Sequence, residues 1–244
     1  MNVLYEDEWM LAVDKPAGML VHGDGTGEPS LTEVLRGELE ARGDHKAAKH
    51  LQPVQRLDVP TTGVVLFSKS KTAQPKLDAL MASKEGVTKR YLAIVRGEFP
   101  WEGLVLCQRI GRDRHDARRM RVSEHGKKAL TRVTRLAGTG ERGARLSLVS
   151  AVIETGRKHQ IRVHLSAAGY PIVGDALYGV PADRAGSGKG GHGKRAVAGA
   201  ANGGLMLHAL EERLTHPMTG ERVVIAAPYP ERFDALIERP ASLE

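Results

Sequence analysis

The chain has 244 residues and a single cysteine, Cys107, so no disulfide can form within it. Low cysteine content is typical of proteins that work in the reducing cytosol, and we expect a cytoplasmic protein. Cys107 follows Val105 and Leu106, and this apolar setting predicts a buried thiol. No run approaches eighteen apolar residues and no basic-then-apolar leader opens the chain, so we expect neither secretion nor a membrane partner.

Motifs for nucleotides and metals are also missing. Residues 186–190 resemble a phosphate-binding loop, but Asp183 replaces its first glycine and Gly190 replaces the hydroxyl residue that would hold magnesium. His159 and His164 are five residues apart, which is wrong for two ligands on one helix face. The sequence therefore predicts an activity with no cofactor and no metal.

The net charge is positive: 36 Lys and Arg stand against 29 Asp and Glu, a difference of +7, and the pI is about 9.6. A basic protein most often has a polyanionic partner, commonly nucleic acid, although a merely basic surface is the alternative. The densest cluster is predicted to contact an RNA or DNA backbone, with a solvated loop as the alternative. It consists of Arg109, Arg112, Arg114, Arg118, Arg119 and Arg121.

A second basic group lies at the start of an expected helix. Arg157, Lys158 and Arg162 there could hold a phosphate or pair with a carboxylate. A polar helix face explains the same pattern, so the spacing alone leaves the choice open.

The alternation of apolar residues predicts an α+β fold, with a mixed, mainly antiparallel sheet and flanking helices on one side. Expected strands cover residues 3–5, 10–13, 64–67, 91–95, 104–106, 130–135 and 146–152, and a hairpin covers 205–214 and 222–226. Expected helices cover 31–40, 73–81, 160–168 and 231–238, the first capped by Ser30 with Glu33. We expect one catalytic domain over residues 1–244, with a flexible basic, glycine-rich loop at 181–204.

One carboxylate, Asp58, stands out from the rest of the sequence. Residues 55–63 read Gln-Arg-Leu-Asp-Val-Pro-Thr-Thr-Gly and lead straight into the apolar run of residues 64–67. An acid on a tight turn at the mouth of a buried strand favours a catalytic role. Carboxylates are common in loops, so a structural role for Asp58 is the alternative.

Taken in order, these segments resemble the RluA-type family of RNA pseudouridine synthases over nearly the whole chain. The catalytic motif of that family resembles Arg56-Leu57-Asp58 followed by Thr62-Gly63. The other matching segments are Lys15-Pro16-Ala17-Gly18, residues 89–97, 155–165 and 171–175, Leu177-Tyr178-Gly179, Leu207-His208-Ala209 and residues 216–220.

The resemblance implies the pseudouridine synthase fold and an isomerisation that moves the glycosidic bond of uracil from N1 to C5. Asp58 would be the essential carboxylate, attacking C1′ of the ribose, attacking C6 of the base, or taking a sugar proton. Arg162 would be the counter-ion that keeps Asp58 charged. Tyr91 would stack on the flipped base and is a candidate for removing the C5 proton.

The rest of the pocket is also implied by the resemblance. Arg56 would fill the space that the flipped uridine leaves, and Leu57 would lie in the substrate pocket beside it. Ile161 and Leu207 would form apolar walls. Arg157 and the arginine cluster would contact a stem-loop of ribosomal or transfer RNA.

Gln55 departs from the family pattern, which usually has histidine before Arg-Leu-Asp. Glutamine keeps hydrogen bonding but cannot titrate. The alternative function is therefore a weak or inactive RNA-binding or ribosome-assembly protein on the same fold. A nucleoside glycosidase is a further alternative, but it needs a second carboxylate, and none is obvious beside Asp58.

Many relatives carry an S4-type RNA-binding domain before the catalytic one. This chain opens on the expected catalytic strands, so we expect a stand-alone catalytic domain, acting as a monomer. Target choice would then come from loops, namely residues 23–27, 109–121 and 181–204.

Overall fold

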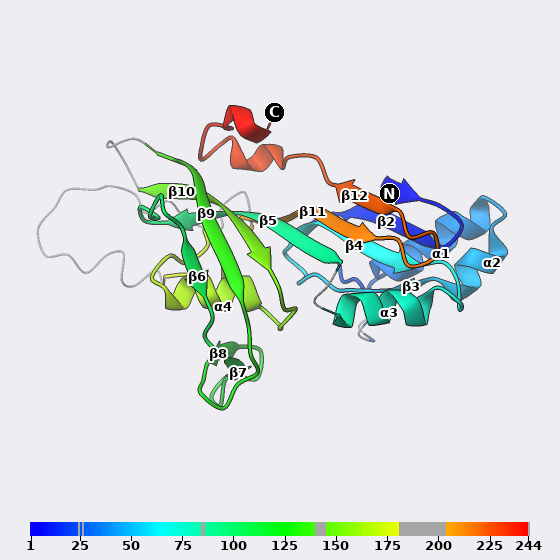
Figure 1. The fold of residues 1–244 in the computed structure, drawn as a ribbon, viewed down its shortest axis with the longest axis horizontal. Coiled ribbons are helices and arrows are strands. Elements are labelled where there is room, and N and C mark those ends of the chain that lie inside the picture. The colour runs from blue at the N-terminus through cyan, green and yellow to red at the C-terminus, as the bar shows by residue number, and fades with distance from the viewer. Residues whose placement is uncertain (24, 26, 84–85, 140–144, 181–203, 244) are drawn as a thin grey trace, which may run out of the picture. The chain divides into compact units, whose positions relative to one another are not determined.

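The computed structural model describes residues 1–23, 25, 27–83, 86–139, 145–180 and 204–243 (Figure 1). The chain divides into two compact units. The first unit contains Met1–Arg90 and His208–Pro228, and the second contains Tyr91–Leu207 and Tyr229–Glu244. A single catalytic domain stays a prediction, and the loop expected at 181–204 lies outside the described residues except for Gly204.

The first unit contains a mixed sheet in the order β1-β2-β4-β11, with β12 beside β11 and β3 beside β4. Its strands are β1 (Asn2–Glu6), β2 (Met10–Lys15), β3 (Gln52–Pro53), β4 (Thr62–Ser68), β11 (Leu207–Thr215) and β12 (Arg222–Ala226). Strand β11 runs parallel to β4 and antiparallel to β12. The predicted mixed, mainly antiparallel sheet is confirmed.

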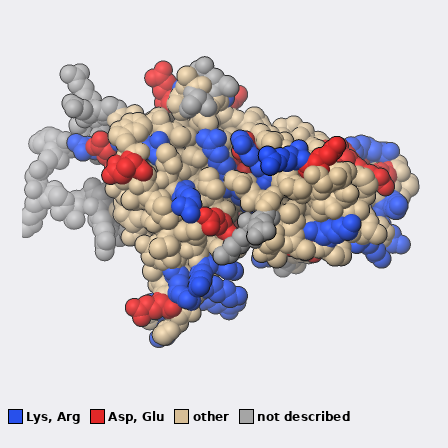
Figure 2. Space-filling view, in the orientation of Figure 1, with Lys and Arg blue, Asp and Glu red and all other residues tan. Residues whose placement is uncertain are grey.

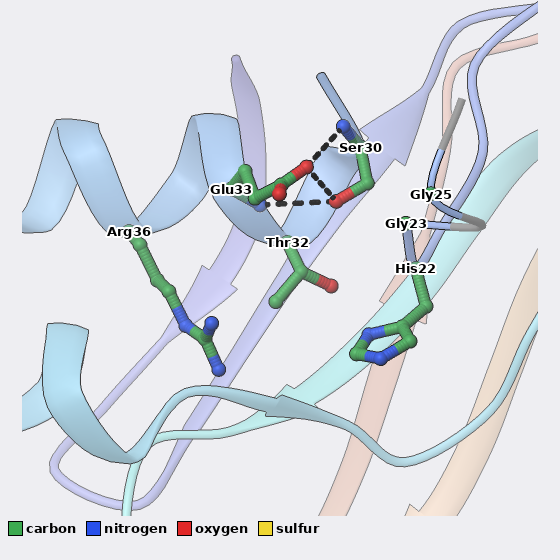
Figure 3. Close-up of a pocket in the computed structure, with 7 residues that line it drawn as sticks. All are labelled: His22, Gly23, Gly25, Ser30, Thr32, Glu33 and Arg36. Atoms are coloured by element: carbon green, nitrogen blue, oxygen red, sulfur yellow. Dashed lines mark hydrogen bonds between the residues drawn. The ribbon is translucent and has the colours of Figure 1, made fainter. Parts of the chain in front are cut away.

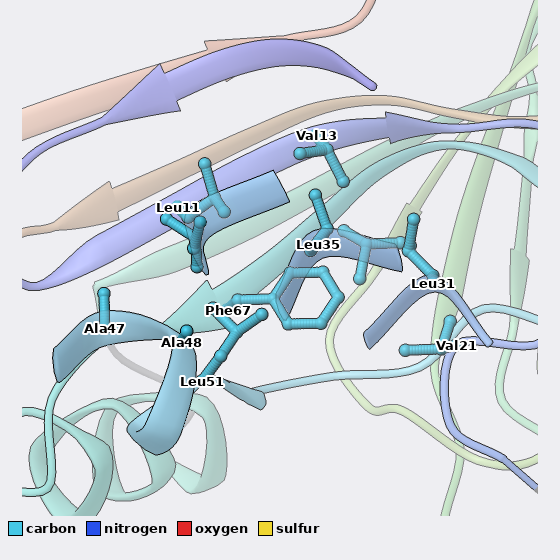
Figure 4. Close-up of a cluster of buried hydrophobic side chains, with 11 residues drawn as sticks. Leu11, Val13, Val21, Leu31, Leu35, Ala47, Ala48, Leu51 and Phe67 are labelled. Atoms are coloured by element: carbon cyan, nitrogen blue, oxygen red, sulfur yellow. The ribbon is translucent and has the colours of Figure 1, made fainter. Parts of the chain in front are cut away.

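Helices cover both faces of this sheet, so the expectation of helices on one side was wrong. Successive strand residues point to opposite faces. Leu11 and Val13 of β2 pack with Leu35 of α1 (Leu31–Ala41), as Figure 4 shows. Met10 and Ala12, the alternate residues, share the other core cluster with a buried leucine of α3 (Gln74–Ala82).

Local capping signals explain where two helices begin. The predicted capping box of α1 is confirmed, because the Ser30 hydroxyl accepts from the Glu33 N–H and the Glu33 carboxylate accepts from the Ser30 N–H. Asp44 caps α2 (His45–His50) by accepting from the Ala47 N–H at 3.0 Å. Helix α2 was not predicted, because six residues are too few to show a helical period.

The described part of the second unit contains strands in the order β5-β10-β9-β6, with β5 from Tyr91 onward, a separate hairpin and the helix α4. These elements are β5 (Val87–Arg96), β6 (Leu104–Leu106), β9 (Thr131–Gly138), β10 (Leu146–Ile153), the hairpin β7 (Ile110–Arg112) and β8 (Met120–Val122), and α4 (Gln160–Ala167). The four strands and the helix predicted at 160–168 are confirmed, but the hairpin was not predicted. Its strands have three residues each, too few to show a strand period.

Two expectations for the second unit were wrong. Cys107 is exposed rather than buried, because it follows the last residue of β6, beyond the buried Leu106. The helix expected at 231–238 is only the 3₁₀ turn η2 (Glu231–Phe233), with η3 (Ala241–Leu243) after it. Pro230 occupies the N-cap position and offers no side-chain hydrogen bond to the free N–H groups of the first turn, so no capping interaction supports a longer helix. Within the described residues, no helix has the length and apolarity to span a bilayer.

Candidate active site

A tight turn in the first unit presents Asp58. The Asp58 carbonyl accepts the Thr61 N–H at 3.0 Å, and the Val59 carbonyl accepts the Gly18 N–H at 2.9 Å. The Lys15 ammonium also donates to the Val59 carbonyl at 2.9 Å. The segment from Lys15 to Gly18 therefore holds the Asp58 turn from behind, which joins two motifs that are 40 residues apart in the sequence.

Lys15 is a charged residue that sequence reasoning assigned no role. Its side chain is fully buried, and it donates a second hydrogen bond, to the Pro16 carbonyl at 2.8 Å. Burial lowers the pKa of Lys15 to about 8, while the negative charge of Asp58 acts in the opposite direction. A buried cation thus accompanies Asp58 in the first unit. The sequence signal that could have pointed to Lys15 is its position at the end of an apolar strand.

Gly63, after the turn, has a backbone conformation and a close neighbour that exclude any side chain. Its φ is +105°, and a Cβ at this position would lie 2.1 Å from the Ala209 carbonyl oxygen. The close approach arises because Gly63 pairs with Ala209 where β4 and β11 run parallel. Gly63 therefore allows the two strands to meet directly after the Asp58 turn.

Gln55, three residues before Asp58, bridges a buried ion pair. Its amide nitrogen donates to the Glu212 carboxylate and its amide oxygen accepts from the Lys89 ammonium. Lys89 Nζ also lies 3.7 Å from Glu212 Oε1. Burial raises the pKa of Glu212 and lowers the pKa of Lys89. Both the nitrogen and the oxygen of the Gln55 amide therefore have partners, and the side chain connects the start of the Asp58 segment to β11.

The residues predicted to stack on the base, to pair with Asp58 and to form the apolar walls lie in the second unit and are buried. Tyr91 on β5 is 9% exposed and Arg162 on α4 is 4% exposed. Ile161 and Leu207, the predicted apolar walls, are 5% and 4% exposed. Asp58 belongs to the first unit, so a shared pocket and an Arg162–Asp58 ion pair stay predictions. In the first unit Arg56 is exposed and Leu57 packs against the core.

Asp175 grips Arg162 through two parallel hydrogen bonds. Arg162 Nε donates to Asp175 Oδ2 at 2.7 Å, and Arg162 Nη2 donates to Oδ1 at 2.8 Å. Asp175 also accepts the backbone N–H groups of Leu177 and Tyr178. Burial alone would raise the pKa of Asp175, but the hydrogen bonds and charge of Arg162 hold it below its ordinary value. Arg162 is therefore fixed by a partner that the sequence did not identify.

A basic cavity of about 450 Å³ joins the hairpin β7–β8 to the segment before α4. Its charged lining combines Arg112, Lys127, Arg157 and Lys158, with His125 beside them. Gly126 closes the base of the hairpin, where a Cβ would lie 2.4 Å from the Ile110 carbonyl carbon. The structure thus brings together Arg112 and Arg157, which come from the two basic groups seen in the sequence.

The arginines of the cluster differ in how they are held. Figure 2 shows Lys and Arg gathered over the hairpin at the bottom of the view. Arg112, Arg114 and Arg121 are exposed. Others are held by neighbours: Arg109 donates to Gly126 O, Arg118 pairs with Asp116, Arg119 lies over the Tyr178 ring and Arg157 donates to Lys128 O. Contact with RNA stays a prediction for all of them.

A second cavity, of about 240 Å³, lies beside the start of α1 in the first unit (Figure 3). Its polar side chains have structural partners. Ser30 and Glu33 bond to each other, Thr32 donates to the Val21 carbonyl and Arg36 donates to the Leu51 carbonyl. Within the described residues, no group of three His, Cys, Asp or Glu side chains is arranged to hold a metal ion.

Comparison with known proteins identifies the family. The family model described as RNA pseudouridylate synthase matches residues 10–167, well over half of the chain. The chain belongs to this family. The RluA-type resemblance is confirmed, and with it the enzyme class, an isomerase that acts on RNA.

Relatives agree along most of the chain. It is 34% identical over 231 residues to the "Uncharacterized RNA pseudouridine synthase YhcT" of Bacillus subtilis, covering 94% of this chain and 69% of that protein. It is 36% identical to "Ribosomal large subunit pseudouridine synthase D" of Neisseria meningitidis serogroup A, covering 95% and 59%. It is also 36% identical to "Ribosomal large subunit pseudouridine synthase C" of Escherichia coli K12, covering 97% and 69%.

A solved structure shows the same fold for this pseudouridine synthase. "Human RNA Pseudouridylate Synthase Domain Containing 4" is 27% identical, with a TM-score of 0.74 over 98% of this chain and 94% of that one. The predicted α+β pseudouridine synthase fold is confirmed.

Proposed function

We propose that this chain converts specific uridines to pseudouridine in structured ribosomal or transfer RNA, with Asp58 as the essential carboxylate. The observation that carries the proposal is the Asp58 turn. The carbonyl of Val59, the residue after Asp58, accepts hydrogen bonds from both Lys15 and Gly18. Such restraint suits a group that must reach a reacting atom in one geometry. Ribosomal RNA is the preferred target class, because two of the relatives above are named for the large ribosomal subunit.

The reaction breaks the N1–C1′ bond of uridine and forms a C5–C1′ bond. The base loses the proton from C5 and gains one at N1, so no oxidant or reductant is consumed. Asp58 would attack C1′, attack C6 or take a sugar proton. Tyr91 would stack on the base and accept the C5 proton, and Arg162 would stabilise the negative charge of Asp58.

A uridine in a stem must leave the stack before it can react, at a cost of roughly a few kcal/mol. The exposed side chain of Arg56, two residues before Asp58, suits the role of filling the vacated space. The basic cavity would hold the RNA backbone, so affinity should fall steeply with salt. A monomeric state and a cytoplasmic location are part of the same proposal.

The test is Asp58→Asn, assayed by pseudouridine formation in a uridine-containing RNA. We expect turnover to disappear while RNA binding stays within about twofold of wild type. Asp78→Asn is the matched control, since Asp78 is an exposed carboxylate of α3 in the same unit. Near wild-type turnover of the Asp58 variant would show that another group performs the reaction.

The same assay separates the proposal from a non-catalytic RNA-binding protein. If wild type binds the RNA but forms no pseudouridine in any mapped transcript, the weak or inactive alternative holds. If wild type does form pseudouridine, mapping in total cellular RNA, with and without the gene, identifies the target RNA and its uridine.

A further inference from the structure

Tyr178 joins the basic hairpin to α4 inside the second unit. Its ring is buried, with 6% of the residue exposed. The Tyr178 hydroxyl accepts the Met120 N–H of β8 at 2.8 Å. It also lies 2.7 Å from His159 Nδ1, at the residue that caps α4. One hydroxyl therefore bridges the hairpin and the helix.

The Met120 half of this bridge has a fixed direction. A backbone N–H can only donate, so the Met120 bond uses the oxygen lone pair of Tyr178. The hydroxyl keeps its proton and a second lone pair for His159 Nδ1, and the His159 tautomer sets which of the two atoms donates. His159 has a φ of +57°, which is uncommon for a residue with a side chain. The Tyr178 bond supports this conformation at the start of α4.

The ring of Tyr178 serves two arginines that belong to different elements. The guanidinium carbon of Arg119, in the hairpin loop, lies 5.3 Å from the ring centroid. That of Arg162, on α4, lies 5.1 Å from it. The Tyr178 N–H also donates to Asp175, which grips Arg162. The same residue thus contacts the hairpin, Arg162 and the partner of Arg162.

We propose that Tyr178 is a positioning residue that couples the basic hairpin β7–β8 to Arg162. Its hydroxyl sets the place of the hairpin, and therefore RNA affinity. Its ring holds Arg119 and Arg162 in their rotamers, and therefore affects turnover as well. The inference rests on the proposed contact between the hairpin and RNA.

The test separates the hydroxyl from the ring. Tyr178→Phe removes both hydroxyl bonds but keeps the ring, so we expect KM for RNA to rise about tenfold with kcat within about twofold. Tyr178→Leu also removes the ring, so kcat should fall about tenfold or more. The salt slope of RNA binding should decrease by about one in both variants, since a phosphate contact is lost.

A matched control exists in the same unit. Tyr229 is equally buried, and its hydroxyl has no hydrogen-bond partner among the described residues. Tyr229→Phe should therefore leave KM, kcat and the salt slope unchanged. If losing a buried tyrosine hydroxyl had a general effect on folding, Tyr178→Phe and Tyr229→Phe would both show it.

Two outcomes would overturn the inference. Unchanged KM and salt slope in folded Tyr178→Phe would show that the hydroxyl does not place the hairpin. A fall in kcat alone would show that it serves Arg162 only. The double variant Arg112→Ala, Lys127→Ala tests the RNA contact itself. If it raises KM while Tyr178→Phe does not, the proposed function stands and the inference about Tyr178 fails.

Discussion

The Lys15 ammonium and the Val59 carbonyl form a 2.9 Å hydrogen bond that ties a fully buried cation to the residue after Asp58. The bond connects the end of β2 to the Asp58 turn across 44 residues of sequence. It restrains the turn and supplies positive charge near a carboxylate. The first three predictions concern this turn.

Replacing Lys15 with methionine should affect both stability and rate. The variant removes the charged hydrogen bonds of Lys15 to the Pro16 and Val59 carbonyls, which costs about 1–3 kcal/mol of unfolding free energy. The single-turnover rate should fall about tenfold or more, because the Asp58 turn loses its anchor. Lys69→Met is the control: Lys69 is a buried lysine of the same unit that bonds to Glu6 and Asp7. If the control is as slow as Lys15→Met, the loss of rate does not come from the Lys15 bond to the Asp58 turn.

Lys15 should also give the protein a specific alkaline pH dependence. Its pKa in the folded protein is about 8, below the ordinary 10.5. Between these values the unfolded chain binds the additional proton, so unfolding free energy rises with pH at up to about 1.4 kcal/mol per pH unit. Urea denaturation between pH 7 and 10 should show this rise in wild type relative to Lys15→Met. Parallel stability curves for the two proteins would contradict it.

Gly63→Ala should prevent correct pairing of β4 with β11. The new Cβ would lie 2.1 Å from the Ala209 carbonyl oxygen, and the backbone has φ of +105°. A loss of roughly 3 kcal/mol or more is expected, measured by thermal or urea denaturation. Gly37→Ala in α1 is the control, because its Cβ would meet nothing within 4 Å, and it should be neutral or slightly stabilising. Equal stability of the two variants would refute the close contact.

Glu212→Gln should remove the pH dependence of stability that the buried carboxylate causes. Burial raises the pKa of Glu212 above its ordinary 4.5. The folded state therefore holds the proton more tightly, and this stabilisation is lost as pH rises through the raised pKa. The stability of wild type minus that of Glu212→Gln should fall from pH 4.5 upward in urea titrations. Glu211→Gln, on the opposite face of β11, is the matched control.

Asp175→Asn should loosen the hold on the Arg162 side chain. Its effect on stability should depend on pH in the direction opposite to that of Glu212→Gln. Removing one charge of a buried pair costs about 3 kcal/mol at neutral pH, and the rate should fall about tenfold because Arg162 is no longer held. The pKa of Asp175 lies below 3.8, so its stabilising contribution is present above that pH and disappears on further acidification. The stability gap to wild type should close in acid. Asp234→Asn, at an exposed carboxylate of the same unit, should show neither effect.

Local patterns were enough for much of the fold. The Ser30–Glu33 capping box and the apolar runs of β4, β5 and β10 act over a few residues, so the sequence displays them directly. Hairpin β7–β8 was not predicted, because its strands have only three residues each. The prediction for residues 231–238 was wrong, because the apolar spacing was helical but the N-cap, Pro230, provides no capping hydrogen bond and only a 3₁₀ turn forms.

The candidate site divides in the same way. The sequence by itself determined the Arg56-Leu57-Asp58 motif, the basic cluster and the family, because residue order and spacing carry that information. Tertiary structure alone decided that Lys15 and Gly18 hold the Asp58 turn, and that Gln55 meets Glu212 across 157 residues. It also chose Asp175 as the partner of Arg162. A buried charge takes its partner from whatever residue the fold brings near, and sequence spacing does not encode that distance.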